Sequence, residues 1–137
     1  MEIRVIADDY AVSPQIAPED VPGIVAAGYT TVICNRPDEE VPVELQSGAL
    51  RAAVEAAGLS FVLHPITHPT INAETVGRQM EIVAASDGPV FAYCASGTRC
   101  SILWSLGQVG RMSADDILAA TAKAGYNLSA LRPRLGG

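Results

Sequence analysis

Short apolar runs alternate with longer amphipathic stretches along the whole chain. The runs of strand length cover residues 3–6, 10–12, 30–34, 60–64 and 89–93, and the amphipathic stretches begin near Pro18, Val43, Asn72, Ser101 and Ser113. This alternation is typical of a parallel sheet with helices on its faces. At 137 residues the chain also falls within the usual size of one domain. We therefore predict an α/β fold over residues 1–137, a single domain whose mostly parallel central sheet is flanked by helices.

Composition and charge exclude several function classes. No apolar stretch approaches the roughly 20 residues that span a bilayer, and Met1–Arg4 lacks the layout of a signal peptide, so we expect a cytoplasmic protein without a membrane partner. The net charge is −6 and the nine Lys and Arg residues are scattered, which argues against nucleic acid. Three cysteines, two histidines and no Cys-x-x-Cys pair lead us to expect no metal and no cofactor.

The segment with the strongest chemical signal is Cys94-Ala95-Ser96-Gly97-Thr98-Arg99. It follows a predicted strand and leads into a predicted helix, where free backbone N–H groups and the helix dipole favour a bound anion. The same field lowers the pKa of a cysteine, so Cys94 is the candidate nucleophile. Gly97 suits a tight loop that approaches its ligand closely. The planar guanidinium of Arg99 can donate hydrogen bonds to two oxygens of an anion at once.

The anion-binding set that this segment predicts is Ala95, Ser96, Gly97, Thr98, Arg99 and Cys100, together with Arg36. A buried, inert cysteine is the alternative for any free thiol. The predicted strand and helix on either side of Cys94 favour the reactive one, because this arrangement is what the chemistry requires.

Other candidates lie at the ends of neighbouring strands. Asp38 is a catalytic candidate if it faces Cys94, and the alternative is an ion pair with Arg36 that holds the loop. Cys34 ends a strand that could neighbour Cys94, as a redox partner or as a core thiol. His64 and His68 are interpreted as loop residues bonded to backbone, with substrate contact as the alternative.

Three motifs occur together in order: Ile33-Cys34-Asn35-Arg36-Pro37-Asp38, the Cys94–Arg99 loop followed by Leu103-Trp104, and Ala124-Gly125-Tyr126-Asn127-Leu128. With them the chain resembles the phosphatase-like domain of the beta-lactamase-hydrolase-like proteins. The resemblance implies a dual-specificity-phosphatase-like fold and a domain also described as a sulfurtransferase. Some relatives carry it fused to a metallo-hydrolase associated with persulfide oxidation, which implies a functional link to such an enzyme. One departure is Cys100, where the resemblance leads us to expect a serine.

Sulfur and phosphorus chemistry both use a thiolate that attacks a tetrahedral anion. Cysteine phosphatases place five residues between Cys and Arg, whereas here four intervene, the spacing of rhodanese-type sulfurtransferases. A phosphate monoester also needs a proton donor, and residues 63–72 contain no Asp or Glu. We therefore predict a sulfurtransferase acting on thiosulfate or a persulfide. The alternatives are a phosphatase for phosphate esters and a non-catalytic module that binds anions or persulfides.

Overall fold

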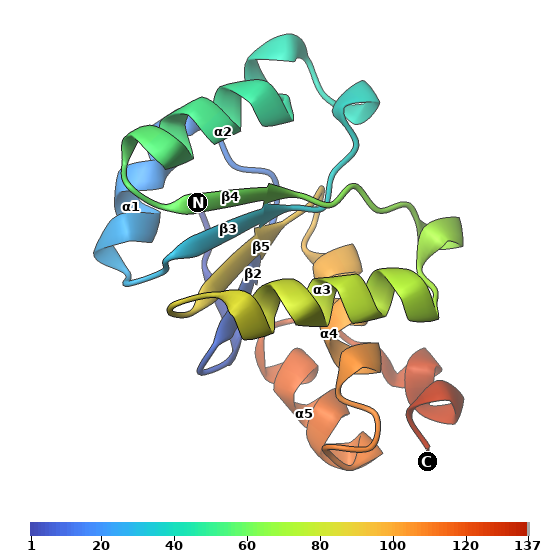
Figure 1. Cartoon of the computed structure of the whole chain (residues 1–137). Helices are drawn as coiled ribbons and strands as arrows, with labels where there is room; N and C mark the ends of the chain where they lie inside the picture. Colours follow the sequence, from blue (N-terminus) through green and yellow to red (C-terminus); the bar gives the residue numbers. More distant parts are fainter. Residues whose placement is uncertain (137) are drawn as a thin grey trace.

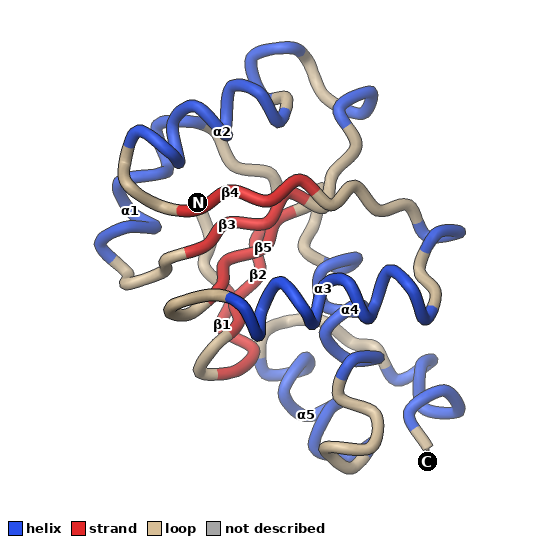
Figure 2. Tube along the Cα trace, in the orientation of Figure 1, coloured by secondary structure: helices blue, strands red, loops and turns tan. Residues whose placement is uncertain are grey.

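Five short strands form one sheet, in the spatial order β1, β2, β5, β3, β4 (Figures 1 and 2). The computed structural model describes residues 1–136, and its strands are β1 Arg4–Ala7, β2 Tyr10–Ser13, β3 Thr31–Cys34, β4 Ser60–Leu63 and β5 Val90–Tyr93. Only β1 runs antiparallel to its neighbour, β2, and the other pairs are parallel. The predicted mostly parallel sheet is confirmed, and the carboxyl ends of β2, β3, β4 and β5 share one edge.

Five helices cover the two faces of the sheet: α1 Val21–Ala26, α2 Ser47–Ala56, α3 Ala73–Ala85, α4 Thr98–Gly107 and α5 Ala114–Lys123. Helices α1 and α2 lie on one face, and α3, α4 and α5 on the other (Figure 1). Helices α3 and α5 begin where the amphipathic stretches predicted them, at caps in which the side chain of Asn72 accepts from Thr75 N–H and that of Ser113 from Asp116 N–H.

Strand β5 is buried on both faces, as expected for a strand between two parallel neighbours. Val90 and Ala92 pack on the α3–α5 side, whereas Phe91 and Tyr93 pack on the α1–α2 side. Because side chains alternate along a strand, Cys94, the next residue, belongs to the α3–α5 core. The alternation of side chains along β5 therefore places Cys94 on the face of the sheet that α3, α4 and α5 cover.

Two segments differ from the sequence-based expectation. The helix expected from about Val43 is split, because Gln46 is extended and its side-chain amide donates to the carbonyls of Asp38 and Val41. Residues Val43–Leu45 form a separate 3-10 turn. Residues Ser129–Leu135, for which the sequence analysis predicted no element, form a 3-10 segment whose last residue is buried in the core. An isolated apolar residue after a proline gives no periodic signal, so only packing reveals its role.

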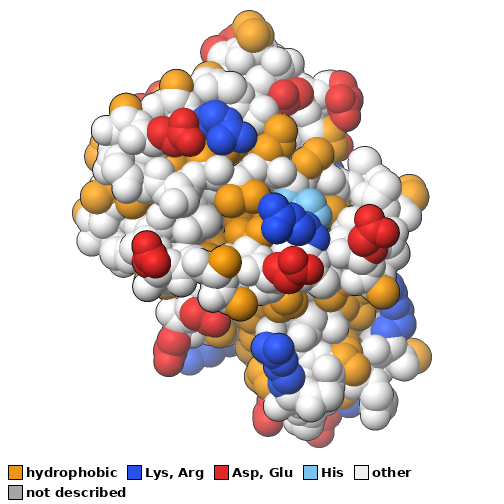
Figure 3. Space-filling model, in the orientation of Figure 1, with side chains coloured by type: hydrophobic (Ala, Val, Ile, Leu, Met, Phe, Trp, Pro, Cys, Tyr) orange, Lys and Arg blue, Asp and Glu red, His pale blue; other side chains and the backbone are white. Residues whose placement is uncertain are grey.

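The surface carries both signs of charge. Figure 3 shows acidic and basic side chains interspersed over the face that α3 and β4 form. No helix among residues 1–136 has the length and apolar character needed to cross a membrane.

Candidate active site

The loop between β5 and α4 is shaped by one glycine and one tyrosine. Gly97 has a φ of 92°, in the left-handed region that favours glycine. A Cβ at this position would also collide with the hydroxyl of Tyr126, which donates to the carbonyl of Ser96 at 2.8 Å. The hydroxyls of Ser96 and Thr98 close the outer side of the turn at 2.9 Å. The loop is thus fixed from the distant segment after α5.

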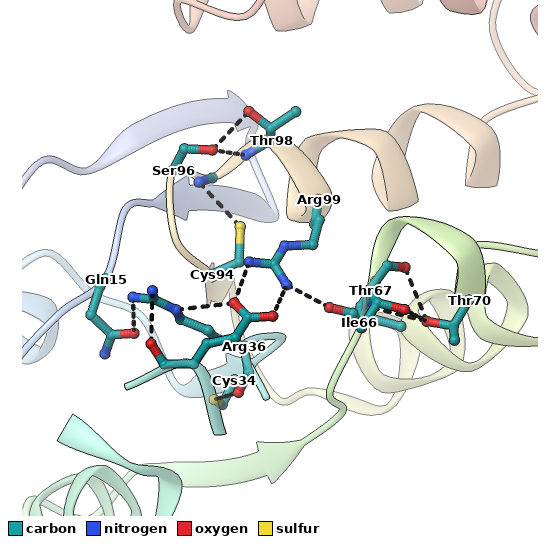
Figure 4. Close-up of polar contacts among 12 residues, drawn as sticks. Gln15, Cys34, Arg36, Ile66, Thr67, Thr70, Cys94, Ser96, Thr98 and Arg99 are labelled. Carbon is teal, nitrogen blue, oxygen red and sulfur yellow. Dashed lines mark hydrogen bonds and ion pairs between the residues drawn. The ribbon is translucent and has the colours of Figure 1, made fainter. Parts of the chain in front are cut away.

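Cys94 is fully buried at the start of this loop, and the N–H of Gly97 donates to its Sγ at 3.1 Å (Figure 4). A side-chain hydrogen bond with Cys100 lowers the pKa of Cys94 most. Burial opposes this, and the backbone N–H groups of Cys100, Gly97 and Arg99 lower the pKa further, to about 5. The hydrogen bonds prevail over desolvation, and at neutral pH the group is a thiolate.

Arg99 is held by two acceptors. Its Nη1 donates to Glu40 Oε2 at 3.0 Å and to the Ile66 carbonyl at 2.7 Å, and its Nη2 donates to Glu40 Oε1 at 2.8 Å. A guanidinium has five N–H donors. Among residues 1–136, none accepts from Nε–H or from the second Nη2–H. These two N–H groups lie on the same edge of the guanidinium, so they can donate to two oxygens of one anion.

Figure 4 shows the guanidinium of Arg99 next to the sulfur of Cys94, and the same guanidinium donates to both oxygens of Glu40. The negative charge of Cys94 is one of the causes that raise the pKa of Arg99, after the Glu40 hydrogen bonds. The arrangement can hold a tetrahedral anion on the free edge of Arg99 with one of its atoms against the thiolate.

Glu40 is a site residue that the sequence analysis missed. Its hydrogen bonds with Arg99 are the main cause that lowers its pKa. Arg36 also contacts it, with Nε at 3.3 Å from Oε1, and donates to Gln15 Oε1 at 3.2 Å. Arg36 and Glu40 are four residues apart, a spacing that signals a local ion pair but gives no hint of a partner 59 positions away.

Gln15 connects this charged group to the cysteine loop. Its backbone N–H donates to the carbonyl of Ala95 at 3.2 Å, and its side chain accepts from Arg36. Arg36 therefore lies at the rim of the site, held by Gln15 and Glu40. The sequence analysis predicted Arg36 as one of the anion-binding residues.

The carboxylate of Asp38 binds the start of α2. Its Oδ1 accepts from the Ser47 N–H at 2.7 Å and its Oδ2 lies 2.9 Å from the Ser47 hydroxyl. The carboxylate therefore caps the first turn of α2. Among residues 1–136 the ion pair that we considered between Asp38 and Arg36 is not formed, because Arg36 pairs with Glu40. The catalytic role of Asp38 stays a prediction that the geometry does not support.

The other two cysteines lie on opposite faces of the sheet. Cys34 packs in the α1–α2 core, on the opposite face of the sheet from Cys94, and its thiol donates to the carbonyl of Arg36 at 3.4 Å. Burial is the main cause that raises the pKa of Cys34. Cys100 is fully buried on the same face as Cys94, and burial raises its pKa well above the ordinary thiol value. All three thiols are free.

The histidines do not contact Cys94. His64 Nδ1 lies 2.7 Å from Gln79 Oε1, and His68 begins a 3-10 turn, His68–Thr70. Within residues 1–136, no three His, Cys, Asp or Glu side chains gather into a metal site.

Comparison with known proteins gives a consistent result. Residues 2–111 match the family described as beta-lactamase hydrolase-like protein, phosphatase-like domain. A beta-lactamase hydrolase-like protein of Agrobacterium fabrum is 34% identical over 119 residues, which are 85% of this chain and 27% of that protein. One from Xylella fastidiosa is 31% identical over 130 residues, 93% of this chain and 30% of that protein. The chain thus spans under a third of the length of these relatives.

Solved structures share the fold. A putative phosphatase from Neisseria meningitidis is 34% identical with a TM-score of 0.88, covering 98% of this chain and 96% of the other. The core catalytic domain of a PP-IP phosphatase from S. cerevisiae, in complex with citrate, is 16% identical with a TM-score of 0.71 over 95% and 80%. The expected relation to cysteine phosphatases is confirmed for the fold. The matched span includes the whole Cys94–Arg99 loop, and the chain belongs to the phosphatase-like domain family of the beta-lactamase hydrolase-like proteins.

Proposed function

We propose that this chain transfers sulfur, with Cys94 as the nucleophile and thiosulfate or a persulfide as the donor. The observation that carries the proposal is a thiolate beside the free edge of Arg99, where neither of the two candidate carboxyl groups, Asp38 and Glu40, is available as a proton donor. Both oxygens of Asp38 contact Ser47, and the hydrogen bonds from Arg99 lower the pKa of Glu40. Sulfite leaves thiosulfate without prior protonation, whereas an alkoxide needs a proton donor.

The first step forms one S–S bond and breaks another. The Cys94 thiolate attacks the outer sulfur of thiosulfate, the sulfur–sulfur bond of thiosulfate breaks, and sulfite leaves with the electron pair. Cys94 then carries a persulfide, Cys94–S–S⁻. In the second step an acceptor such as cyanide or a thiolate attacks the outer sulfur, and the Cys94 thiolate is released. The net charge is the same on both sides of each step.

The protein contributes electrostatic stabilisation and position. The free edge of Arg99 binds two sulfonate oxygens of thiosulfate, and the loop N–H groups that stabilise the thiolate also stabilise the persulfide anion. Four residues between Cys94 and Arg99 make a smaller cradle than the five of cysteine phosphatases. This size favours a single sulfur atom at the thiolate.

The test is incubation with thiosulfate and cyanide, with thiocyanate as the measured product. Wild type should turn over, and without cyanide Cys94 should gain the mass of one sulfur atom. Cys94→Ser should abolish both results. Cys34→Ser is the matched control, because Cys34 lies on the opposite face of the sheet, and it should retain them. A persulfide absent from wild-type Cys94 would contradict the proposal, and loss of turnover in Cys34→Ser would instead favour a relay.

Phosphate ester hydrolysis is the second candidate, favoured by the similarity to the putative phosphatase from Neisseria meningitidis. The Cys94 thiolate would attack phosphorus, the P–O bond would break, and the leaving oxygen would take a proton from water. A phosphocysteine would remain and be hydrolysed. Without a positioned acid, only esters with a weakly basic leaving group, such as aryl phosphates, should react.

A side-by-side assay separates these candidates. Turnover of an aryl phosphate that disappears in Cys94→Ser, without turnover of thiosulfate, would replace sulfur transfer by the phosphatase reaction. Binding of both anions without turnover of either would indicate a non-catalytic module.

A further inference from the structure

A chain of buried hydrogen bonds connects α3 to the first turn of α4. Its centre is an amide pair, in which Gln79 Nε2 donates to Asn35 Oδ1 at 2.8 Å and Asn35 Nδ2 donates to Gln79 Oε1 at 3.0 Å. Gln79 Nε2 also donates to the Tyr10 hydroxyl at 3.2 Å, and this hydroxyl donates to the Cys100 carbonyl at 2.8 Å. Gln79, Asn35 and Tyr10 are all fully buried.

The direction of these bonds is fixed by the carbonyl at the end of the chain. A carbonyl only accepts, so Tyr10 must donate to Cys100 and accept from Gln79. The Gln79 oxygen therefore faces Asn35 Nδ2 and His64 Nδ1, which lies 2.7 Å away. His64 Nδ1 must then carry a proton, and every donor and acceptor of the Gln79 amide is engaged.

One arm of this network leads to Arg99. Asn35 Nδ2 donates to the His64 carbonyl at 2.8 Å, and the Asn35 carbonyl accepts from the Ile66 N–H at 2.8 Å. The carbonyl of Ile66 in turn accepts from Arg99 at 2.7 Å. Asn35 thus fixes the loop that holds the guanidinium.

The other arm leads to Cys94. Tyr10 anchors the carbonyl of Cys100, in the turn where Gly97 donates to the sulfur. Both the side chain and the N–H of Cys100 lower the pKa of Cys94. An apolar side chain at position 79 would leave Asn35 Oδ1, which is buried, without the donor that Gln79 provides. A buried amide costs stability unless every bond is made, so the fully paired Gln79 ties Asn35 and Tyr10 into one arrangement.

We propose that Gln79 is a positioning residue, which sets the nucleophile and the guanidinium relative to each other through Tyr10 on one side and Asn35 on the other. The inference rests on the proposed role of Cys94 as the nucleophile. It does not depend on whether the substrate is a thiosulfate or a phosphate ester.

The test measures the site without turnover. The rate of Cys94 alkylation by iodoacetamide, followed against pH, gives the acidity of the thiol, and protection by sulfate at pH 8 gives the affinity for a tetrahedral anion. We expect Gln79→Leu to raise the titration midpoint of Cys94 by about one pH unit and to weaken sulfate protection about 3- to 10-fold, the size of a lost hydrogen bond.

Tyr10→Phe isolates one arm and is the more conservative variant. Tyr10→Phe should raise the titration midpoint of Cys94 by about half a pH unit, which corresponds to the loss of one weak hydrogen bond. It should leave sulfate protection at pH 8 unchanged. Leu50→Ala is the control, because Leu50 is fully buried in the α1–α2 core. It should lower thermal stability and change neither property of the site.

The proposal is overturned if Tyr10→Phe keeps the wild-type midpoint, or if Leu50→Ala shifts it as much as Gln79→Leu. Should Gln79→Leu fail to fold, Tyr10→Phe still decides the Cys94 arm. Failure of the proposed sulfur transfer is a separate result, since it appears as an absent persulfide while the alkylation profiles still differ among the variants.

Discussion

Replacement of Glu40 by aspartate keeps the negative charge of the site but shortens the side chain by one methylene. Glu40 holds Arg99 through two bonds of 3.0 and 2.8 Å, and the shorter aspartate should keep only one. A hydrogen bond between charged groups contributes about 1.5–3 kcal/mol. Since the Glu40 side chain is 33% exposed, solvent screening reduces this to about 1–1.5 kcal/mol. We therefore expect Glu40→Asp to weaken anion binding by about tenfold.

The assay is protection of Cys94 from iodoacetamide by sulfate, supported by kcat/KM for thiosulfate. Glu40→Gln is the companion variant, because it keeps the length of the side chain and removes the charge. If Glu40 positions Arg99, then Glu40→Asp binds sulfate more weakly than wild type. If the carboxylate instead competes with the anion for the guanidinium, both variants bind sulfate more tightly. Sulfate affinity in Glu40→Asp at or above the wild-type level would refute the positioning argument.

Three further predictions concern stability. The low pKa of Cys94, about 5, means that its contribution is complete above the ordinary thiol pKa and is lost as pH falls towards 5. Between pH 8 and pH 6, urea unfolding should therefore show wild type losing about 2 kcal/mol more than Cys94→Ala, and equal slopes would contradict this. Gly97→Ala, which meets Tyr126 and a left-handed φ, should lower Tm by several degrees, whereas Gly48→Ala, where a Cβ meets nothing within 4 Å, should not; equal Tm values would refute the collision. Asp38→Asn should cost about 1 kcal/mol of helix capping in the same urea assay and leave kcat unchanged, and a large loss of kcat with unchanged stability would restore Asp38 as a catalytic group.

The sequence predicted those parts of the site that follow from local order. A strand, a glycine-containing turn and a helix occur in succession at Cys94, so the order of residues alone indicates that the thiol lies at a helix N-terminus. The caps at Asn72 and Ser113 were predictable for the same reason, because a cap acts on an N–H three residues away.

Contacts between distant segments could not be predicted in this way. Glu40 meets Arg99 across 59 positions, and Gln79 meets Tyr10 across 69. An acidic residue in an irregular loop and a glutamine on a helix have no distinguishing pattern in sequence. The same limit led to Asp38 as the candidate acid, since its bond to Ser47 depends on how the loop after β3 folds back onto α2.

By itself the sequence determined the α/β class, the mostly parallel sheet and the place of Cys94 at a helix N-terminus, where backbone N–H groups stabilise its thiolate. Each of these depends on periodicity or on neighbours within one turn, which the order of residues records directly. The tertiary structure decided which carboxylate holds Arg99, which face of the sheet each thiol occupies and which buried amide joins the two arms of the site. These depend on how the strands align and how the loops pack at their shared edge, and residues far apart in the chain acquire their partners only there.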